Sequence, residues 1–298
     1  MRYKVSTLFL LIACQLASAN NDNFSFALEA GLVNDSQLAV EEIDQFESTS
    51  DTAKHFQFEA DGNWKPADKL NVKAGYSYMD QSYQDNDEFD LTISRLHGDV
   101  SYDFPWLTLG VNQHKIDAKL AGDGFLDMTR KGYYIGKLFA NSFYLRAESL
   151  EIDKTFDTLG DRNAETSALA VDGYYFFNDG LSFFSVGYET EDEKANAPEF
   201  SYDGTNYRAT FSNKFSFLDK NSQMKLFWRY SDRDYKDIYP GIDQSRADTK
   251  SIYGLNWTLW FNDTLSLITE VEQTDSESNL ESADYDATQV SLILRAEF

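Results

Sequence analysis

The amino-acid sequence predicts an all-β protein, a transmembrane antiparallel up-and-down β-barrel of about 14 strands. Three observations support this fold class. Apolar and polar residues alternate with a period of two, short and long connections alternate between the segments, and the last segment ends in an aromatic residue, Phe298. The alternating segments have roughly the 9 to 11 residues that a tilted strand needs to cross a bilayer.

The clearest alternation covers residues 55–64, where Phe56 and Phe58 share one face of the predicted strand. Gln57 and Glu59 share the other face, as expected for a barrel strand with lipid outside and water inside. The other segments begin near Phe24, Leu70, Leu91, Trp106, Thr129, Phe143, Ser167, Leu181, Tyr207, Met224, Ser251, Thr264 and Ala287.

The connections between segments alternate in length. Short ones are expected at 65–69, 105, 140–142, 178–180, 219–223 and 262–263. They alternate with acidic stretches of about 10 to 20 residues, an asymmetry typical of barrels with periplasmic turns and outer loops. The stretch of about 20 residues after the first strand is long enough to fold into the lumen, and the sequence leaves that open. A soluble antiparallel sandwich would explain the alternation, but neither the connection pattern nor the terminal Phe.

The N-terminus has the pattern of a secretory signal peptide. Arg2 and Lys4 form a basic region, residues 5–16 are mostly apolar, and a small-residue cleavage site follows. We therefore expect a signal peptide at 1–19 and an outer-membrane β-barrel at 20–298.

A lipoprotein-type site at Cys14 competes with cleavage after Ala19. Cleavage after Ala19 would leave a mature chain without cysteine, and hence without disulfides or thiol chemistry. The alternative requires a very short apolar stretch for export, and the two sites remain alternatives.

Composition narrows the class of partners. The formal charge of −24, from 50 acidic and 26 basic residues, argues against a nucleic-acid surface. The aromatic fraction of 15% argues against disorder. After the signal, no window approaches the roughly 18 apolar residues of a membrane helix, so a closed barrel is the expected way to span lipid. The acidic outer loops are expected to meet lipopolysaccharide through divalent cations.

The inward-facing charges suggest a lumen with two oppositely charged sides. By parity along the strands, the candidate selectivity residues are Arg208, Lys214, Lys225 and Arg229 on the basic side and Glu59, Asp61, Glu270 and Glu272 on the acidic side. Such charges tune the selectivity of a water-filled channel. The same charges could instead pair and plug a narrow lumen, and strand number alone does not decide between an open and a plugged barrel.

The closing segment carries a candidate assembly signal. Val290, Leu292 and Leu294 alternate with polar residues, and the chain ends at Phe298. This pattern resembles the C-terminal signal that outer-membrane barrels of Gram-negative bacteria present to the barrel-assembly machinery. The usual aromatic residue two positions before the end is replaced by Ala296.

Catalysis is not expected. His97 and Asp99 share one strand face, but residues two apart on a strand are about 6.6 to 6.8 Å apart, too far for a direct hydrogen bond. No motif places a nucleophile beside them, and we expect no enzyme activity, metal site or cofactor.

Short motifs in the first and last loops carry a family resemblance. They are Asp35-Ser36-Gln37, Arg246-Ala247-Asp248, Ser278-Asn279-Leu280, Ala283-Asp284-Tyr285 and the closing strand to Phe298. Together they resemble the barrel domain of surface lipoprotein assembly modifiers and related barrels that carry tetratricopeptide repeats, with Gln37 as a departure. The resemblance implies a 14-stranded barrel. The helical-repeat domain of that family is not expected here, because the barrel begins about four residues after the predicted cleavage site. The plan is also similar to small monomeric porins.

The leading hypothesis is a porin-like outer-membrane channel that passes small polar solutes or an exported substrate. One alternative is an accessory barrel for surface display or secretion of a protein client, with a periplasmic partner protein. Another is a structural barrel that binds lipopolysaccharide through its acidic loops.

Overall fold

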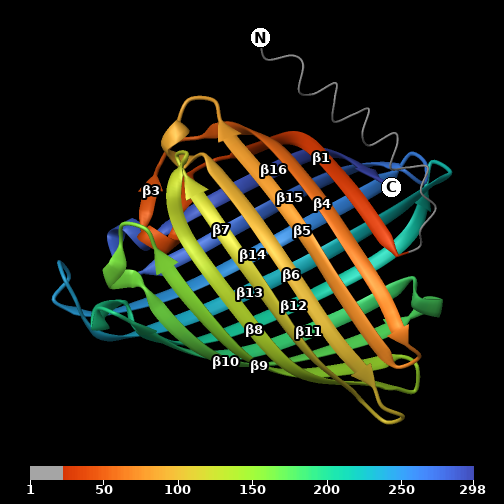
Figure 1. Ribbon diagram of the computed structural model, residues 1–298. Helices are drawn as coiled ribbons and strands as arrows, with labels where there is room; N and C mark the ends of the chain where they lie inside the picture. The colour runs from red at the N-terminus through yellow and green to blue at the C-terminus, as the bar shows by residue number, and fades with distance from the viewer. Residues whose placement is uncertain (1–22) are drawn as a thin grey trace.

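Within residues 23–298, fourteen of the sixteen strands form one closed barrel in which each strand pairs antiparallel with its neighbours (Figure 1). The computed structural model describes residues 23–298, so the predicted signal peptide at 1–19 lies outside the described residues. The barrel strands are β1 (Phe24–Asp35), β4 (Asp51–Ala67), β5 (Leu70–Tyr83), β6 (Leu91–Asp103), β7 (Thr108–Leu120), β8 (Asp123–Phe139), β9 (Phe143–Phe156), β10 (Ala164–Phe177), β11 (Ser182–Ala195), β12 (Tyr202–Phe217), β13 (Lys220–Tyr239), β14 (Gln244–Trp260), β15 (Leu265–Ser278) and β16 (Tyr285–Glu297).

The first and last strands close the barrel. β1 pairs with β16 from Ala27 opposite Glu297 to Asp35 opposite Gln289. The Phe298 N–H donates to the Phe26 carbonyl at 2.9 Å, which extends the pairing to the end of the chain. Closure leaves no free sheet edge, the condition for a β-structure to sit in lipid. The predicted fold class is therefore confirmed.

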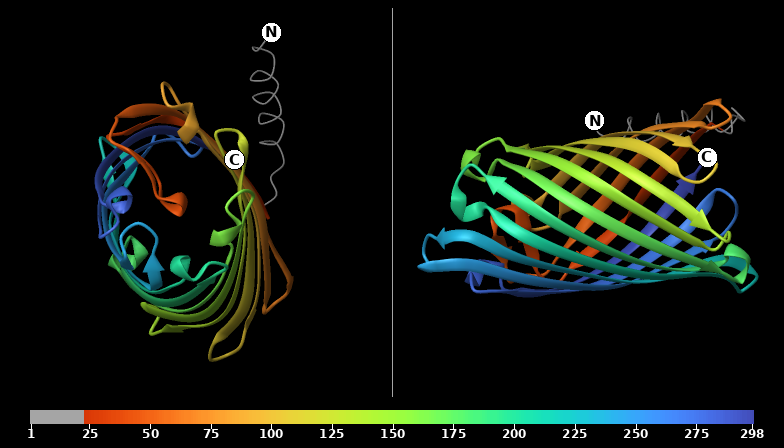
Figure 2. Two further views of the ribbon diagram at one scale, coloured as in Figure 1. Left: turned by 90° about the vertical axis from the view of Figure 1, so that its left-hand side faces the viewer. Right: turned by 90° about the horizontal axis from the view of Figure 1, so that it is seen from below.

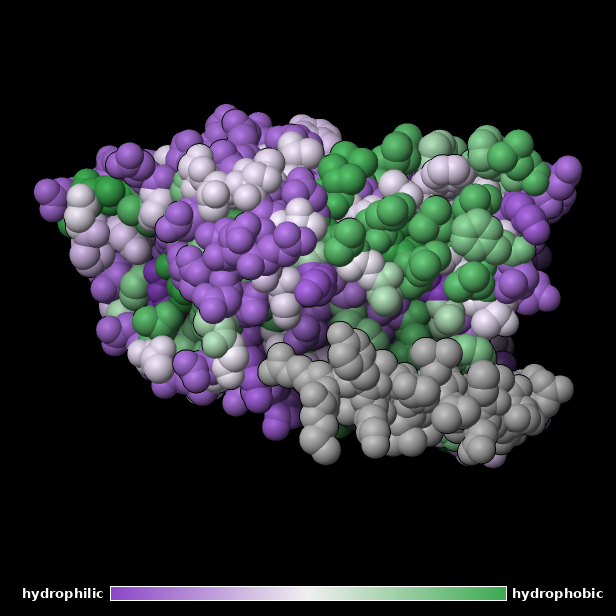
Figure 3. Space-filling view, turned by 90° about the horizontal axis from the view of Figure 1, so that it is seen from above, coloured by the Kyte–Doolittle hydropathy of each residue, from purple (hydrophilic) through white to green (hydrophobic). Residues whose placement is uncertain are grey.

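The outer face of the barrel is apolar toward the end that carries the short turns. Leu96, Ile135, Leu169, Val186 and Leu255 are exposed there, and the opposite faces of their strands point into the barrel. Figure 3 shows one face of the barrel, with hydrophobic residues gathered over one end and hydrophilic ones over the other. An exposed apolar belt on a closed barrel matches the hydrocarbon layer, and it confirms the predicted outer-membrane location.

The predicted short turns are confirmed. They lie at 68–69, 104–107, 140–142, 178–181, 218–219 and 261–264. The prediction of 10- to 20-residue loops at the opposite end was wrong beyond the first loop, because the later connections there are only two to seven residues long. At 121–122, positive φ angles of 52° at Ala121 and 85° at Gly122 form a two-residue turn where a long loop was expected.

The residues that were expected to form long loops extend the strands instead. β13 has 20 residues and β4, β8 and β14 have 17 each, well beyond the 9 to 11 that cross lipid. Above the membrane, a strand meets water on its outer face as well. The apolar and polar alternation then disappears from the sequence although the ladder continues.

The first loop, residues 36–50, is different, and we call it the inserted loop. It contains β2 (Leu38–Val40), η1 (Glu41–Ile43) and β3 (Gln45–Glu47). Viewed along the barrel in Figure 2, this segment lies inside the ring of strands. The remaining short helices are η2 (Asp87–Phe89), η3 (Gly160–Arg162), η4 (Asn178–Gly180), η5 (Pro198–Phe200) and η6 (Glu281–Ala283). Within 23–298, no helix has the length and apolar character needed to cross a membrane.

A small apolar core lies in the lumen. Ala118, Leu126 and Phe156 form a buried cluster on β7, β8 and β9, and Ile43 of the inserted loop packs against it. Burial of these side chains fixes one side of the loop to the barrel through the hydrophobic effect.

Candidate functional site: a lumen narrowed by the inserted loop

The inserted loop presents two carboxylates to the barrel. The first is Glu41 at the start of η1. Its Oε2 lies 2.6 Å from Lys250 Nζ on β14, and its Oε1 accepts a hydrogen bond from Arg233 Nη1 on β13 at 3.0 Å. The side chain remains 39% exposed to the lumen, so solvent screens part of this attraction.

Asp44, which ends η1, makes the buried contact. Its Oδ2 accepts a hydrogen bond of 2.5 Å from Arg162 Nη2, and its Oδ1 lies 2.8 Å from Arg246 Nη1 on β14. The Asp44 and Arg246 side chains are only 7% and 4% exposed. Arg162 belongs to η3, between β9 and β10, which lie opposite β1 in the ring. The loop therefore bridges the lumen from one side to the other.

The two arginines that hold Asp44 are themselves held in place. Arg162 stacks on the Phe200 ring at 4.2 Å, and Arg246 lies over the Tyr235 ring at 4.7 Å. Arg246 also contacts Asp248 Oδ2 at 2.7 Å. Such stacking and bidentate pairing orient a guanidinium before its partner arrives, which favours one docked position of the loop.

Electrostatics keeps Glu41 ionised. Burial by itself would raise the pKa of this carboxyl, but Arg233 and Lys250 outweigh burial and lower the pKa from its ordinary 4.5 to about 2. The carboxylate is thus charged at every pH at which the loop is expected to work.

The predicted basic side of the lumen pairs mostly with its own neighbours. Arg208 on β12 contacts Asp172 on β10 at 2.8 Å and Glu189 on the adjoining β11 at 3.6 Å, all on the same side of the lumen. Arg229 does meet a predicted acidic partner, because its Nη2 lies 2.6 Å from Glu272 Oε2. Within the described chain, Lys214 and Lys225 form no ion pair.

The predicted acidic residues also lie on the lumen face. Glu59 contacts Arg295 at 3.1 Å, Asp61 contacts His97 at 3.1 Å, and Glu270 accepts a hydrogen bond from Asn256 at 2.7 Å. Of the eight predicted selectivity residues, the structure brings only Arg229 and Glu272 into direct contact. The selectivity role of all eight stays a prediction.

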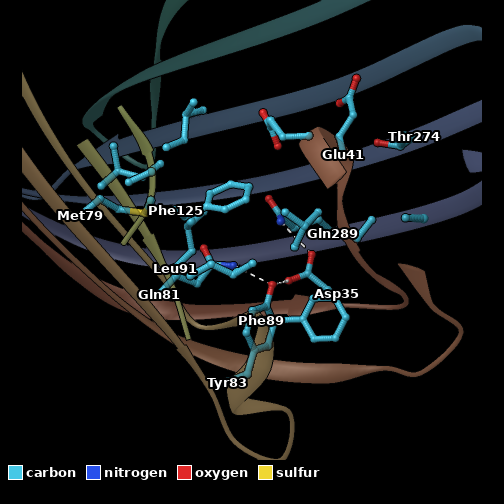
Figure 4. A pocket seen from close by; sticks show the side chains of 18 of the residues that line it. Asp35, Glu41, Met79, Gln81, Tyr83, Phe89, Leu91, Phe125, Thr274 and Gln289 are labelled. Atoms are coloured by element: carbon cyan, nitrogen blue, oxygen red, sulfur yellow. Dashed lines mark hydrogen bonds between the residues drawn. The ribbon is translucent and has the colours of Figure 1, made fainter. Parts of the chain in front are cut away.

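A cavity of about 730 Å³ lies beside the inserted loop. Met79, Leu91 and Phe125 line one side, and the hydrogen-bonded Asp35 and Gln289 line the other (Figure 4). The inserted loop forms part of the cavity surface, because Glu41 also lines the cavity. A solute moving past the loop on this side would meet both an apolar and a polar surface.

His97 and Asp99, which share one face of β6, do not contact each other but bind other partners. His97 pairs with Asp61 and stacks on His114 at 5.8 Å between ring centroids. Asp99 instead accepts hydrogen bonds from the Tyr134 hydroxyl at 3.0 and 3.1 Å. The arrangement is one of lumen-lining hydrogen bonds, and the expectation of no catalysis stays a prediction.

The candidate assembly residues occupy the outer surface of the last strand. Val290, Leu292 and Leu294 are exposed on the lipid-facing side of β16. Their role in barrel assembly, like that of Phe298, stays a prediction.

Comparison with known proteins identifies the fold. No family model and no curated protein matches the chain. Among solved structures, the anion-selective porin from Comamonas acidovorans covers 92% of this chain and 98% of its own, with a TM-score of 0.55 at 10% identity. The chain has a porin-like outer-membrane β-barrel fold.

Two further structures agree. OmpT, an outer membrane protein of Vibrio cholerae, covers 94% of this chain and 99% of its own at a TM-score of 0.52 and 9% identity. CdiB from Acinetobacter baumannii covers 93% of this chain, with a TM-score of 0.52 at 8% identity, although this chain spans only 60% of CdiB. At these identities the porin-like likeness concerns the fold, and the predicted resemblance to surface lipoprotein assembly modifiers is not among these findings.

Proposed function

We propose that this barrel is a passive outer-membrane channel that admits small polar solutes through a charged lumen narrowed by the inserted loop. The observation that carries the proposal is the docking of Glu41 onto Lys250 of β14 and of Asp44 onto both Arg246 of β14 and Arg162 of η3, which leaves the cavity of about 730 Å³ beside the loop. Facilitated diffusion needs no covalent step, so neither a catalytic residue nor a cofactor enters the proposal.

Ion selectivity follows from the lumen charges. Replacing Arg208, Lys214, Lys225 and Arg229 by Gln would remove four positive charges. Carboxylates that now pair with these cations, such as Asp172, would lose their partner. The lumen would become more negative, and its preference for cations should rise. The reversal potential of single channels in a planar bilayer, under a salt gradient, measures this preference. An unchanged reversal potential would contradict the selectivity assignment.

Conductance also separates this proposal from the two other roles predicted above. Discrete open steps from the purified protein support a channel. A protein that inserts, stays silent and is purified from cells with a bound periplasmic protein would instead support an accessory role in surface display or secretion. A silent barrel without a partner, whose thermal stability depends on divalent cations and lipopolysaccharide, would support a structural role.

A further inference from the structure

The cavity beside the inserted loop has an apolar surface where a channel lumen is usually polar. Five of the side chains that form it come from three neighbouring strands, β6, β7 and β8, and we call them the apolar wall. They are Leu91, Ile93, Ile116, Leu126 and Met128. Their positions follow from pairing, since Ile116 lies opposite Met128 and Ile93 lies opposite Ala118. The wall is therefore a continuous patch on the inner face.

Packing of the inserted loop explains only part of this patch. Ile43 covers the buried cluster formed by Ala118, Leu126 and Phe156. Leu91, Ile93, Ile116 and Met128 are only partly buried and still line the open cavity. An apolar surface that faces a cavity without being covered is a favourable site for an apolar group of a ligand.

Three of the four carboxylates that line the cavity are already engaged, and the fourth, the exposed Glu42, forms no ion pair within 23–298. Glu41 contacts Lys250 at 2.6 Å, and Glu272 contacts Arg229 at 2.6 Å. Asp35 accepts hydrogen bonds from Tyr83 and Gln289, each at 2.8 Å. Glu41, Glu272 and Asp35 consequently have little remaining capacity to attract a cationic ligand.

Arg95 is in the opposite situation. It lines the cavity, yet its side chain forms no ion pair or hydrogen bond with any other residue in 23–298, and the Nε is buried without a partner. It lies directly opposite Ile116 and two residues from Ile93, so it stands at the edge of the apolar wall. Arg130, across β7 from His97, likewise forms no ion pair in the described chain. A buried donor without an acceptor favours an incoming anion.

We propose that the cavity binds amphipathic monocarboxylates, with the apolar group on the apolar wall and the carboxylate on the Arg95 guanidinium. From Leu91 to Arg95 the strand rises roughly 13 Å, enough for a phenyl group or a short alkyl chain. The guanidinium presents paired N–H donors that match the two oxygens of a carboxylate. The inference names the solute class of the proposed channel and rests on that function.

Equilibrium dialysis against the full barrel in nanodiscs tests the inference, with empty nanodiscs to subtract partitioning into lipid. The probes are phenylacetate, phenylethanol, phenethylamine and acetate at neutral pH. We expect phenylacetate to bind about tenfold more tightly than the alcohol, the amine or acetate, because only phenylacetate uses both the wall and the guanidinium. Arg95→Gln should abolish the preference for the acid over the alcohol. Met128→Gln should weaken both.

Lys115→Gln is the matched control. Lys115 lies between His114 and Ile116 on β7, but it points outward, so the same charge is lost without a change in the lumen. Equal binding of phenylacetate and phenylethanol, or an Arg95→Gln variant that keeps the preference, would overturn the inference. An open channel without this preference would overturn the inference alone. Preferential binding to a barrel that never conducts would overturn the proposed channel function and leave the binding site intact.

Discussion

Replacing Asp44 by Asn should loosen the inserted loop without removing any bulk. Removal of one partner from a buried ion pair typically costs about 3–5 kcal/mol. Here the cost should be smaller, because Arg246 keeps its contact with Asp248 at 2.7 Å and the new amide still offers one oxygen to Arg162. We expect about 2 kcal/mol, which corresponds to a roughly 30-fold shift from the docked toward the undocked loop.

Two measurements report that shift. Hydrogen exchange at residues 38–47 should become roughly 30-fold faster if the loop exchanges by undocking. Single-channel recordings should show larger or more frequent open steps, because the loop obstructs the lumen less often. Glu42→Gln is the control, since the exposed Glu42 side chain belongs to the same helix and forms no ion pair within 23–298. If Asp44→Asn left exchange and conductance unchanged, the bridging contacts would not be what holds the loop.

Three further predictions follow from the same structure. The pKa of Glu41 is lowered to about 2 when the loop is docked, so the contribution of Glu41 to docking is complete above pH 4.5 and is lost as pH falls toward 2. Channel conductance should therefore rise over that acid range and fall again on neutralisation. A Cβ at Gly31 would clash with the Leu292 carbonyl oxygen on β16, so Gly31→Ala should destabilise the closing strand pair by about 1–3 kcal/mol in urea unfolding. Gly160→Ala is the control, because a Cβ there would lie in open space and should leave stability unchanged. Phe298→Ala should lower the amount of assembled barrel in cells, seen as heat-modifiable protein on gels, while refolding into detergent stays normal because the terminal backbone pairing is kept.

The membrane-spanning part of the fold is predictable because lipid imposes a strict pattern. Where one strand face meets hydrocarbon and the other meets the lumen, side chains must alternate, as Phe56 and Gln57 do on β4. Short turns are equally visible, since they interrupt that pattern. Above the membrane the constraint ends, and acidic segments such as 189–193 form strand β11 although they appear to be loop in the sequence. The two-residue turn at 121–122 was missed for the same reason.

The inserted loop was harder to predict. Its length allowed entry into the lumen, but Glu41 and Asp44 have the same composition as the acidic residues of the outer loops. Glu41 and Asp44 differ from those residues in the cations that they contact. Arg162, Arg233 and Arg246 are 118 to 202 positions away from them in the sequence. Only closure of the barrel brings these groups together, so no local sequence pattern indicates the contacts.

For the lumen charges, the sequence predicts which face of the strand a side chain occupies but not which residue it pairs with. Parity along the strands placed Arg208 and Arg229 correctly on the inner face, because facing is a local property. Partner choice is not local: Arg208 meets Asp172 across β11, and Arg229 reaches Glu272 across β14. Since paired charges contribute little net field, the groups that remain unpaired should dominate the interaction with a solute. On this argument Arg95 matters more for recognition than its unremarkable place in the sequence suggests, and the Arg95→Gln binding measurement addresses that difference directly.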